Sequence, residues 1–315
     1  MRLVDSGMEV RRMRVRLLTL LATASLFLLG AVPAQADGGG NGGDSNRDDG
    51  QSYLALGDSV PFGFSPLKNP ADADNFVGYP EIVAQQLDLK DVNATCPGEA
   101  TGGFLSLTGT DNVCRPYRAS APLHVHYKTS QMDFALKYLR SHKHTTSLVT
   151  LTLGANDAFR FQKDHPECFS ATPPATCPAL LGGVFATMQA NLDTIFSKIR
   201  GAGYTGVIVA VTYYALNYAD AAGVGGTLAV NAQMIAAGAG HNVLIASGFD
   251  AFAPVAATAA GDSCAAGLLI RLTASTCDVH PTPKGRNLLA SAVIKAIAGS
   301  CPAHDAEDCL RGEGD

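Results

Sequence analysis

Short runs of β-forming residues alternate along this chain with segments whose apolar residues have helical spacing. The expected strands are 52–59, 91–96, 146–157, 205–214 and 241–248, and the expected helices are 79–89, 130–142, 180–199, 227–237 and 285–299. Nearly continuous apolar strands are buried on both faces, and helices between them connect parallel strands. The sequence therefore predicts an α/β fold with a central parallel sheet covered by helices on both sides.

The first 36 residues are typical of a secretory signal peptide. Four arginines between Arg11 and Arg16 precede an apolar run at 17–30, and the sequence AQA ending at Ala36 supplies a cleavage site. A membrane anchor is the alternative interpretation, but the run is shorter than the about 20 residues that a span requires. We therefore expect cleavage near Ala36 and a secreted, extracellular product.

The segment that follows the signal peptide has the composition of a flexible linker. Residues 37–51 contain no apolar residue and consist mostly of Gly and Asp, so they cannot bury any surface. We expect one folded domain at 52–300 and a disulfide-stapled tail at 301–315. That length suits a single α/β domain with one hydrophobic core.

The expected mature chain is acidic. Without the first 36 residues it has 18 basic and 26 acidic residues, a net charge of −8, and no cluster of Lys and Arg. Nucleic acid is therefore not expected as a partner. The mature chain also has no second apolar run long enough for a membrane span, so we expect no stable membrane insertion and a monomer.

All eight cysteines lie beyond the expected linker, and an even number in an exported protein predicts disulfides. A zinc site is the alternative, but no C-x-x-C pair occurs and the cysteines do not cluster with histidines. Proximity in the sequence favours Cys96–Cys114, Cys168–Cys177, Cys264–Cys277 and Cys301–Cys309.

Three residues that suit acyl-transfer chemistry follow three of the expected strands. Ser59 ends the first run, Gly98 follows the second, and Asn156 follows the third. In parallel sheets, ligands bind beyond the carboxyl ends of the strands. A serine with a base can act as a nucleophile, while an Asn amide and exposed N–H groups can stabilise an oxyanion. A plain turn at Ser59 and a helix cap at Asn156 are the alternatives.

Four sequence blocks together resemble a known family. ALGDSV, CPGEAT, LGAND and DVHPTPKG occur in this order between residues 55 and 285. They resemble the blocks of the SGNH family of GDSL-type hydrolases, and the chain is similar to secreted actinobacterial esterases, lipases and phospholipases A. The resemblance implies a flavodoxin-like three-layer α/β/α fold and ester hydrolysis without a cofactor. It also implies local disulfides that fit the first three cysteine pairs.

The resemblance also implies a role for each site residue. Ser59 would be the nucleophile and His280 the general base. The backbone N–H groups of Ser59 and Gly98, together with the side chain of Asn156, would form the oxyanion hole.

The position of the triad acid departs from the family pattern. The family has an acid three residues before the histidine, but here that position is Cys277, and Asp278 stands two residues before His280. Three interpretations remain open. Asp278 orients His280, a backbone carbonyl near Thr276 does so, or Asp278 serves only as a cap or surface partner. In an extended strand, residues two apart lie about 6–7 Å from each other, so the first interpretation requires a bend.

The sequence thus predicts a secreted serine carboxylester hydrolase of the esterase or lipase type, including phospholipase A, acting on a small-molecule or lipid ester. A carbohydrate acetylesterase of the same fold and a non-catalytic surface-binding protein are the alternatives. Segment 116–128 is expected to cover the pocket, and no metal is expected at the histidines of 124–126 and 142–144 because no carboxylate cluster accompanies them. An apolar acyl groove is expected from Phe62, Phe64, Phe104 and Phe159.

Overall fold

The structure, a computed structural model, describes residues 51–301 and 305–311. The expected signal peptide and its cleavage site, nearly all of the expected linker and parts of the tail lie outside the described residues. The described chain contains a five-stranded parallel sheet in the order β2-β1-β3-β4-β5. Its strands are β1 (Ser52–Gly57), β2 (Lys90–Asn93), β3 (Thr146–Thr152), β4 (Val207–Val211) and β5 (Val243–Ala246).

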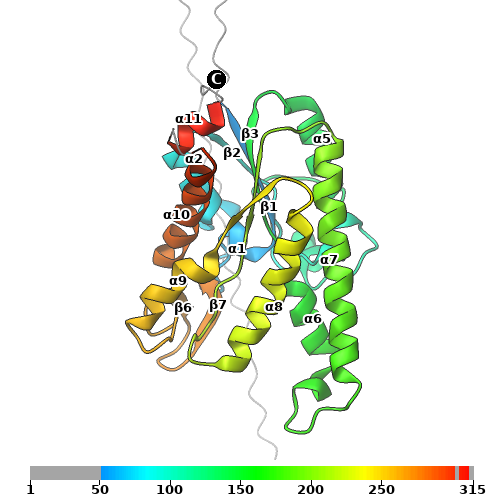
Figure 1. Ribbon diagram of the computed structural model, residues 1–315, viewed down its shortest axis with the longest axis vertical. Helices are drawn as coiled ribbons and strands as arrows, with labels where there is room; N and C mark the ends of the chain where they lie inside the picture. The colour runs from blue at the N-terminus through cyan, green and yellow to red at the C-terminus, as the bar shows by residue number, and fades with distance from the viewer. Residues whose placement is uncertain (1–50, 302–304, 312–315) are drawn as a thin grey trace, which may run out of the picture. The chain divides into compact units, whose positions relative to one another are not determined.

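Helices cover both faces of this sheet (Figure 1). One face is covered by α2, α9 and α10, and the other by α3, α5, α7 and α8. The helices are α1 (Ser59–Phe62), α2 (Tyr79–Gln86), α3 (Thr101–Leu105), α4 (Cys114–Ser120), α5 (Gln131–His142), α6 (Ala155–Asp164), α7 (Cys177–Gly201), α8 (Ala221–Gly238), α9 (Gly248–Ala257), α10 (Pro283–Ser300) and α11 (Ala306–Arg311), with short 3₁₀ turns at Ala73–Asn75 and Pro166–Phe169.

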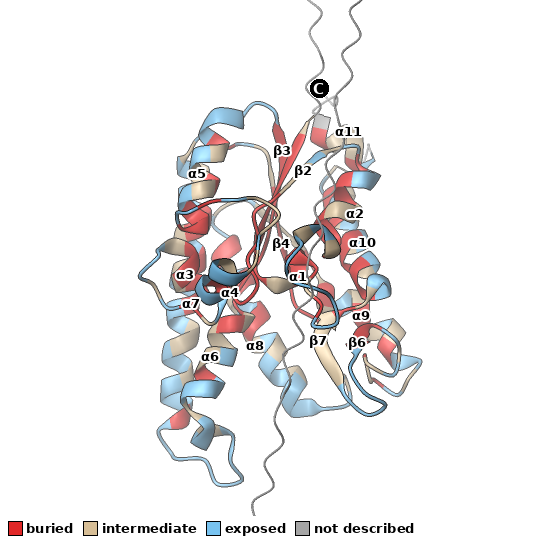
Figure 2. Cartoon of the chain, turned by 180° about the vertical axis from the view of Figure 1, so that it is seen from behind, coloured by how far each residue is buried: buried red, intermediate tan, exposed pale blue. Residues whose placement is uncertain are grey.

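The central strands are buried on both sides, as their apolar sequences predict. Every residue of β1 and β3 is buried between the helical layers, and the strands at the centre of Figure 2 are coloured accordingly. The predicted three-layer α/β/α fold is therefore confirmed. Among the described residues, no helix is long and apolar enough to cross a membrane.

Several elements differ from the expected ones. The sequence did not predict α3, α4, α6 or α9, and the expected strand 146–157 ends at Thr152, before α6 begins at Ala155. Helix α8 begins at Ala221, six residues before the expected start, although the sequence there is rich in glycine. The side chain of Asp220 accepts a hydrogen bond from the Ala222 N–H at 3.1 Å, and this cap together with packing against α7 outweighs the cost of about 1 kcal/mol per glycine. The tail contains α11, whose Leu310 is buried in the domain core, so this part of the tail is a packed element.

An antiparallel hairpin, β6 (Leu269–Arg271) with β7 (Cys277–Pro281), lies outside the main sheet and was not expected from the sequence. Its register is irregular. Leu269 pairs with Pro281 and Arg271 pairs with Cys277, so β7 has extra residues between the two pairs. Such a bulge bends a strand and redirects its side chains. The bulged residues are Asp278 to His280.

Candidate active site

Ser59 lies at the carboxyl edge of the sheet, in a sharp turn between β1 and α1. Gly57 has φ +130°, and a Cβ there would lie 2.1 Å from the carbonyl oxygen of Thr152, so only glycine fits. The next residue, Asp58, caps α1, because its carboxylate accepts a hydrogen bond from the Val60 N–H at 2.9 Å. The turn therefore presents the Ser59 hydroxyl at the start of a helix.

The hairpin brings His280 to this hydroxyl. His280 Nε2 lies 2.7 Å from Ser59 Oγ, although the two residues are 221 positions apart. The hairpin is attached to the main domain by Tyr214, whose hydroxyl donates to the Val279 carbonyl at 2.7 Å. Phe64 packs edge-on against the imidazole, with ring centroids 4.9 Å apart. The serine and histidine are thus in hydrogen-bonding contact.

Asp278 is the group hydrogen-bonded to the other imidazole nitrogen, Nδ1, of His280. The same carboxylate oxygen accepts the backbone N–H of His280 at 3.0 Å, so the bulge supplies the bend that this short spacing requires. Burial acts to raise the pKa of the Asp278 carboxyl, but hydrogen bonds and charge from His280 outweigh it and lower that pKa. The carbonyl of Thr276 instead accepts N–H groups of Leu272 and Thr273 within the hairpin turn.

The backbone N–H groups of Ser59 and Gly98 have no hydrogen-bond partner within the described part of the chain. Gly98 has φ +80°, and a Cβ there would lie 2.0 Å from Val113 Cγ2, so the loop requires glycine. Both N–H groups remain available to a ligand, as an oxyanion hole requires.

Asn156 is 6% exposed at the start of α6, on the same edge of the sheet. Its Nδ2 lies 3.4 Å from a carboxylate oxygen of Asp58, and its Oδ1 accepts from Asn112 Nδ2 at 3.0 Å. Asn112 therefore fixes which way the Asn156 amide points. Nothing in the sequence indicates Asn112, because it lies in a loop with no motif.

Asp58 is itself buried beneath the serine. Burial raises the pKa of its carboxyl to about 6, although hydrogen bonds from Tyr213 and Val60 oppose the shift. The Tyr213 hydroxyl donates to Asp58 at 2.6 Å and accepts the Ala155 N–H at 3.2 Å. Tyr213, which the sequence did not identify, thus connects the turn that carries Ser59 to the helix that carries Asn156.

Comparison with known proteins identifies the family of this chain. Residues 55–288 match the model of the GDSL-like Lipase/Acylhydrolase family. The chain belongs to this family. The resemblance carried by the four sequence blocks is therefore confirmed. Comparison with curated protein sequences found no match.

Solved structures share the fold of this GDSL-like family member. An extracellular lipase from Streptomyces rimosus has 21% identity and a TM-score of 0.52, and phospholipase A1 from Streptomyces albidoflavus has 20% and 0.51. In both cases the match covers 78% of this chain and 99% of the other. The acetylxylan esterase Axe2 from Geobacillus stearothermophilus has 17% identity and a TM-score of 0.50, covering 78% of this chain and 94% of the other.

The expected aromatic groove of this GDSL-like protein requires correction. Phe62 and Phe104 are fully buried in the core, and Phe159 is 43% exposed on α6. Of the four, Phe64 is the one that contacts His280. The segment expected to cover the pocket does reach this region, because Tyr117 packs against the ring of Phe64 with centroids 6.1 Å apart.

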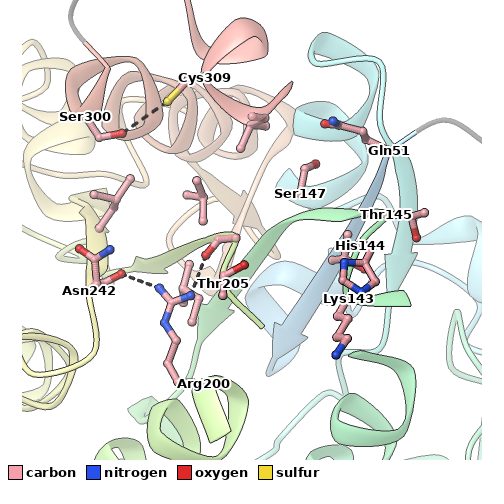
Figure 3. A pocket seen from close by; sticks show the side chains of 16 residues that line it. Gln51, Lys143, His144, Thr145, Ser147, Arg200, Thr205, Asn242, Ser300 and Cys309 are labelled. Atoms are coloured by element: carbon pink, nitrogen blue, oxygen red, sulfur yellow. Dashed lines mark hydrogen bonds between the residues drawn. The ribbon is translucent and has the colours of Figure 1, made fainter. Parts of the chain in front are cut away.

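A cavity of about 620 Å³ lies at the other edge of the sheet in this family member (Figure 3). Its lining includes the first residues of β3 and β4, whereas Ser59 and Asn156 follow strand ends. Figure 3 shows Arg200 among its lining residues, with the guanidinium hydrogen-bonded to the Asn242 carbonyl at 2.8 Å. This cavity is therefore separate from the candidate active site.

The eight cysteines of this hydrolase form the four disulfides that sequence proximity favours. Cys96–Cys114 connects the Gly98 loop to α4, and Cys264–Cys277 connects the segment before β6 to the first residue of β7, next to Asp278. Cys96, Glu99 and Cys114 lie close enough together to suggest a metal site, but both sulfurs are in the disulfide. A disulfide sulfur is not a thiolate ligand, so this cluster does not have the chemistry of a metal site.

Proposed function

We propose that this chain is a secreted serine carboxylester hydrolase that forms an acyl-enzyme on Ser59. The observation that carries the proposal is the 2.7 Å contact between Ser59 Oγ and His280 Nε2, with Asp278 on the opposite nitrogen. A serine hydroxyl becomes an effective nucleophile when a positioned base accepts its proton. Asp278 holds the imidazole in the tautomer that leaves Nε2 free to accept that proton.

The proposed reaction has two halves. Ser59 Oγ attacks the ester carbonyl while its proton moves to His280 Nε2, and the imidazolium then protonates the departing alcohol. Water next attacks the acyl-enzyme, with His280 again accepting the proton, and the acid leaves as Ser59 is restored. The imidazolium formed in each half is stabilised by the Asp278 carboxylate, which remains ionised because its pKa is lowered.

The oxyanion of each tetrahedral intermediate would be bound by three donors. These are the free N–H groups of Ser59 and Gly98 and the side-chain amide of Asn156. In a studied protease, one such side-chain donor contributes about 3–4 kcal/mol to the transition state. The hydrogen bond from Asn112 to Asn156 supports this role, because it turns the amide nitrogen, not the oxygen, toward Asp58 and the site.

The substrate class we favour is a carboxylic ester with an apolar acyl chain. The aromatic ring of Phe64 beside His280 offers an apolar surface for it. Two of the structural neighbours are a lipase and a phospholipase A1, and four disulfides suit an extracellular enzyme. A carbohydrate acetylesterase is the second candidate, favoured by the shared fold of the acetylxylan esterase.

A substrate series tests this proposal. The protein should hydrolyse nitrophenyl esters, and a series from acetyl to palmitoyl, with a phospholipid and acetylated xylan alongside, will distinguish the two substrate classes. A fluorophosphonate should add one covalent adduct, located by mass spectrometry on Ser59. Hydrolysis of acetylated xylan alone would favour the second candidate. If no ester is hydrolysed and Ser59 is not labelled, the protein is not a serine hydrolase and the binding-protein interpretation gains support.

Removing the Cys264–Cys277 disulfide should weaken both stability and activity. The disulfide joins residues 13 apart, and closing a loop of this size is worth about 3 kcal/mol. The Cys264→Ser/Cys277→Ser variant should therefore melt about 5–10 °C lower by calorimetry. The variant should also lose ester hydrolysis, because β7, the strand that carries His280, is no longer tied at its first residue to the segment before β6.

The matched control is Cys301→Ser/Cys309→Ser, which opens a loop of residues 8 apart at the chain end. It should lower the melting temperature but retain the wild-type kcat. Equal activities in the two double variants would contradict a role for Cys264–Cys277 in holding the base.

A further inference from the structure

The side-chain amide of Gln131 is fully buried and is hydrogen-bonded to both the N–H and the carbonyl of Gly57, the last residue of β1. At the start of α5 it is 0% exposed, and its Oε1 accepts the Gly57 N–H at 2.6 Å. Its Nε2 donates to the Gly57 carbonyl at 3.0 Å. Gly57 stands two residues before Ser59, so Gln131 holds the backbone from which the nucleophile turn begins.

The same amide reaches the loop that carries Gly98. Gln131 Nε2 lies 3.3 Å from Oε2 of Glu99, the residue that follows Gly98, and Glu99 is 2% exposed. This contact adds to the hydrogen bond that the N–H of Cys96, two residues before Gly98, donates to the Gly57 carbonyl at 3.0 Å. The Gly98 carbonyl accepts a hydrogen bond from the N–H of Val113, the residue that precedes α4.

We propose that Gln131 and Glu99 are positioning residues that set the spacing between the Ser59 hydroxyl and the Gly98 N–H. The role rests on the ester hydrolysis proposed above. An oxyanion donor acts only when it lies at hydrogen-bond distance from the developing charge, and a displacement of about 1 Å can cost about a hundredfold in rate. The two residues do not contact the substrate, so they act through Gly57 and Gly98.

The protonation state of Glu99 matters because its carboxyl adjoins a site that binds negative charge. Burial, together with the charge of Asp111, raises the pKa of Glu99 to about 8, although the hydrogen bond from Gln131 and the charges of Arg118 and Arg115 oppose the shift. Tyr127 also faces the carboxyl, and burial raises the pKa of its hydroxyl well above the usual range. Glu99 is therefore largely neutral at pH 7, where it bonds to Gln131 without repelling an oxyanion.

The first test replaces Gln131 with methionine, which has a similar length and no polar group. We expect kcat for a nitrophenyl ester to fall about 10- to 100-fold, with KM within about twofold of the wild-type value. The control is Gln85→Met on the exposed side of α2, which should keep the wild-type kcat. A folded Gln131→Met enzyme, judged by its melting curve, that keeps the wild-type kcat would overturn the proposal.

The second test holds even if Gln131→Met does not fold. Glu99→Gln keeps a neutral group of the same shape, so its kcat at pH 7 should stay within about twofold of the wild type. As pH rises from 7 to 9.5, ionisation of Glu99 should lower the wild-type kcat about tenfold, while the variant keeps its rate. Parallel pH profiles would overturn the proposal. A wild-type protein without esterase activity would instead refute the proposed function, and this inference with it.

Discussion

Replacing Ser59 with alanine is expected to lower kcat for ester hydrolysis by about a million-fold. Replacing His280 with alanine should have a similar effect, and the double variant should be no worse than either single one. The reason is that Oγ and Nε2, 2.7 Å apart, transfer one proton as a unit, so loss of either partner removes the whole step. Steady-state kinetics of the three variants measure this non-additivity.

Residual catalysis about a thousandfold above the uncatalysed rate should persist in all three variants, because the oxyanion donors remain. The control is Ser141→Ala on the exposed side of α5, which should retain full activity and the same melting temperature. A folded Ser59→Ala protein that retains more than about one per cent of the wild-type kcat would exclude Ser59 as the nucleophile.

Asp278→Asn is expected to lower kcat about ten-thousandfold, with little change in KM. An asparagine at this position has almost the same shape, but its amide can donate to His280 Nδ1 and thereby favour the tautomer that carries a proton on Nε2. That tautomer cannot accept the Ser59 proton. A loss in kcat of tenfold or less would mean that Asp278 stabilises the hairpin and does not select the tautomer of His280.

The matched control for this change is Asp133→Asn, an exposed aspartate in the first turn of α5.

Asp278 also makes a specific contribution to acid stability. Its pKa is lowered from 3.8 in the folded protein, so its stabilising contribution is present above that value and is lost as pH falls below it. The difference in stability between the wild type and Asp278→Asn should therefore shrink below about pH 4.

The sequence predicted the centre of the sheet well because the central strands are buried. Every residue of β1 and β3 lies between helical layers, so these segments read as continuous apolar runs with no other interpretation. Gly98 could be singled out because a glycine lets the backbone approach a ligand, and the structure places it in a conformation in which a side chain would collide with Val113.

The parts of the site that sequence did not predict depend on contacts between distant segments. Asp278 and His280 are only two residues apart and can contact each other because β7 bulges where it pairs with β6. The pairing of the two strands sets this register, so the sequence of neither strand reveals it. Asn112 and Gln131 carry no local signal. Each becomes identifiable through the backbone or side chain that it meets, 44 and 74 positions away.

The turn at Ser59 follows β1, whereas His280 lies on the β6–β7 hairpin, 221 positions later. A growing polypeptide therefore contains its serine long before it contains its base. Any chain that ends before β7 has an unassisted hydroxyl, which is a poor nucleophile at neutral pH. The proposed hydrolytic competence therefore requires that both the β1 turn and β7 have been made and brought together.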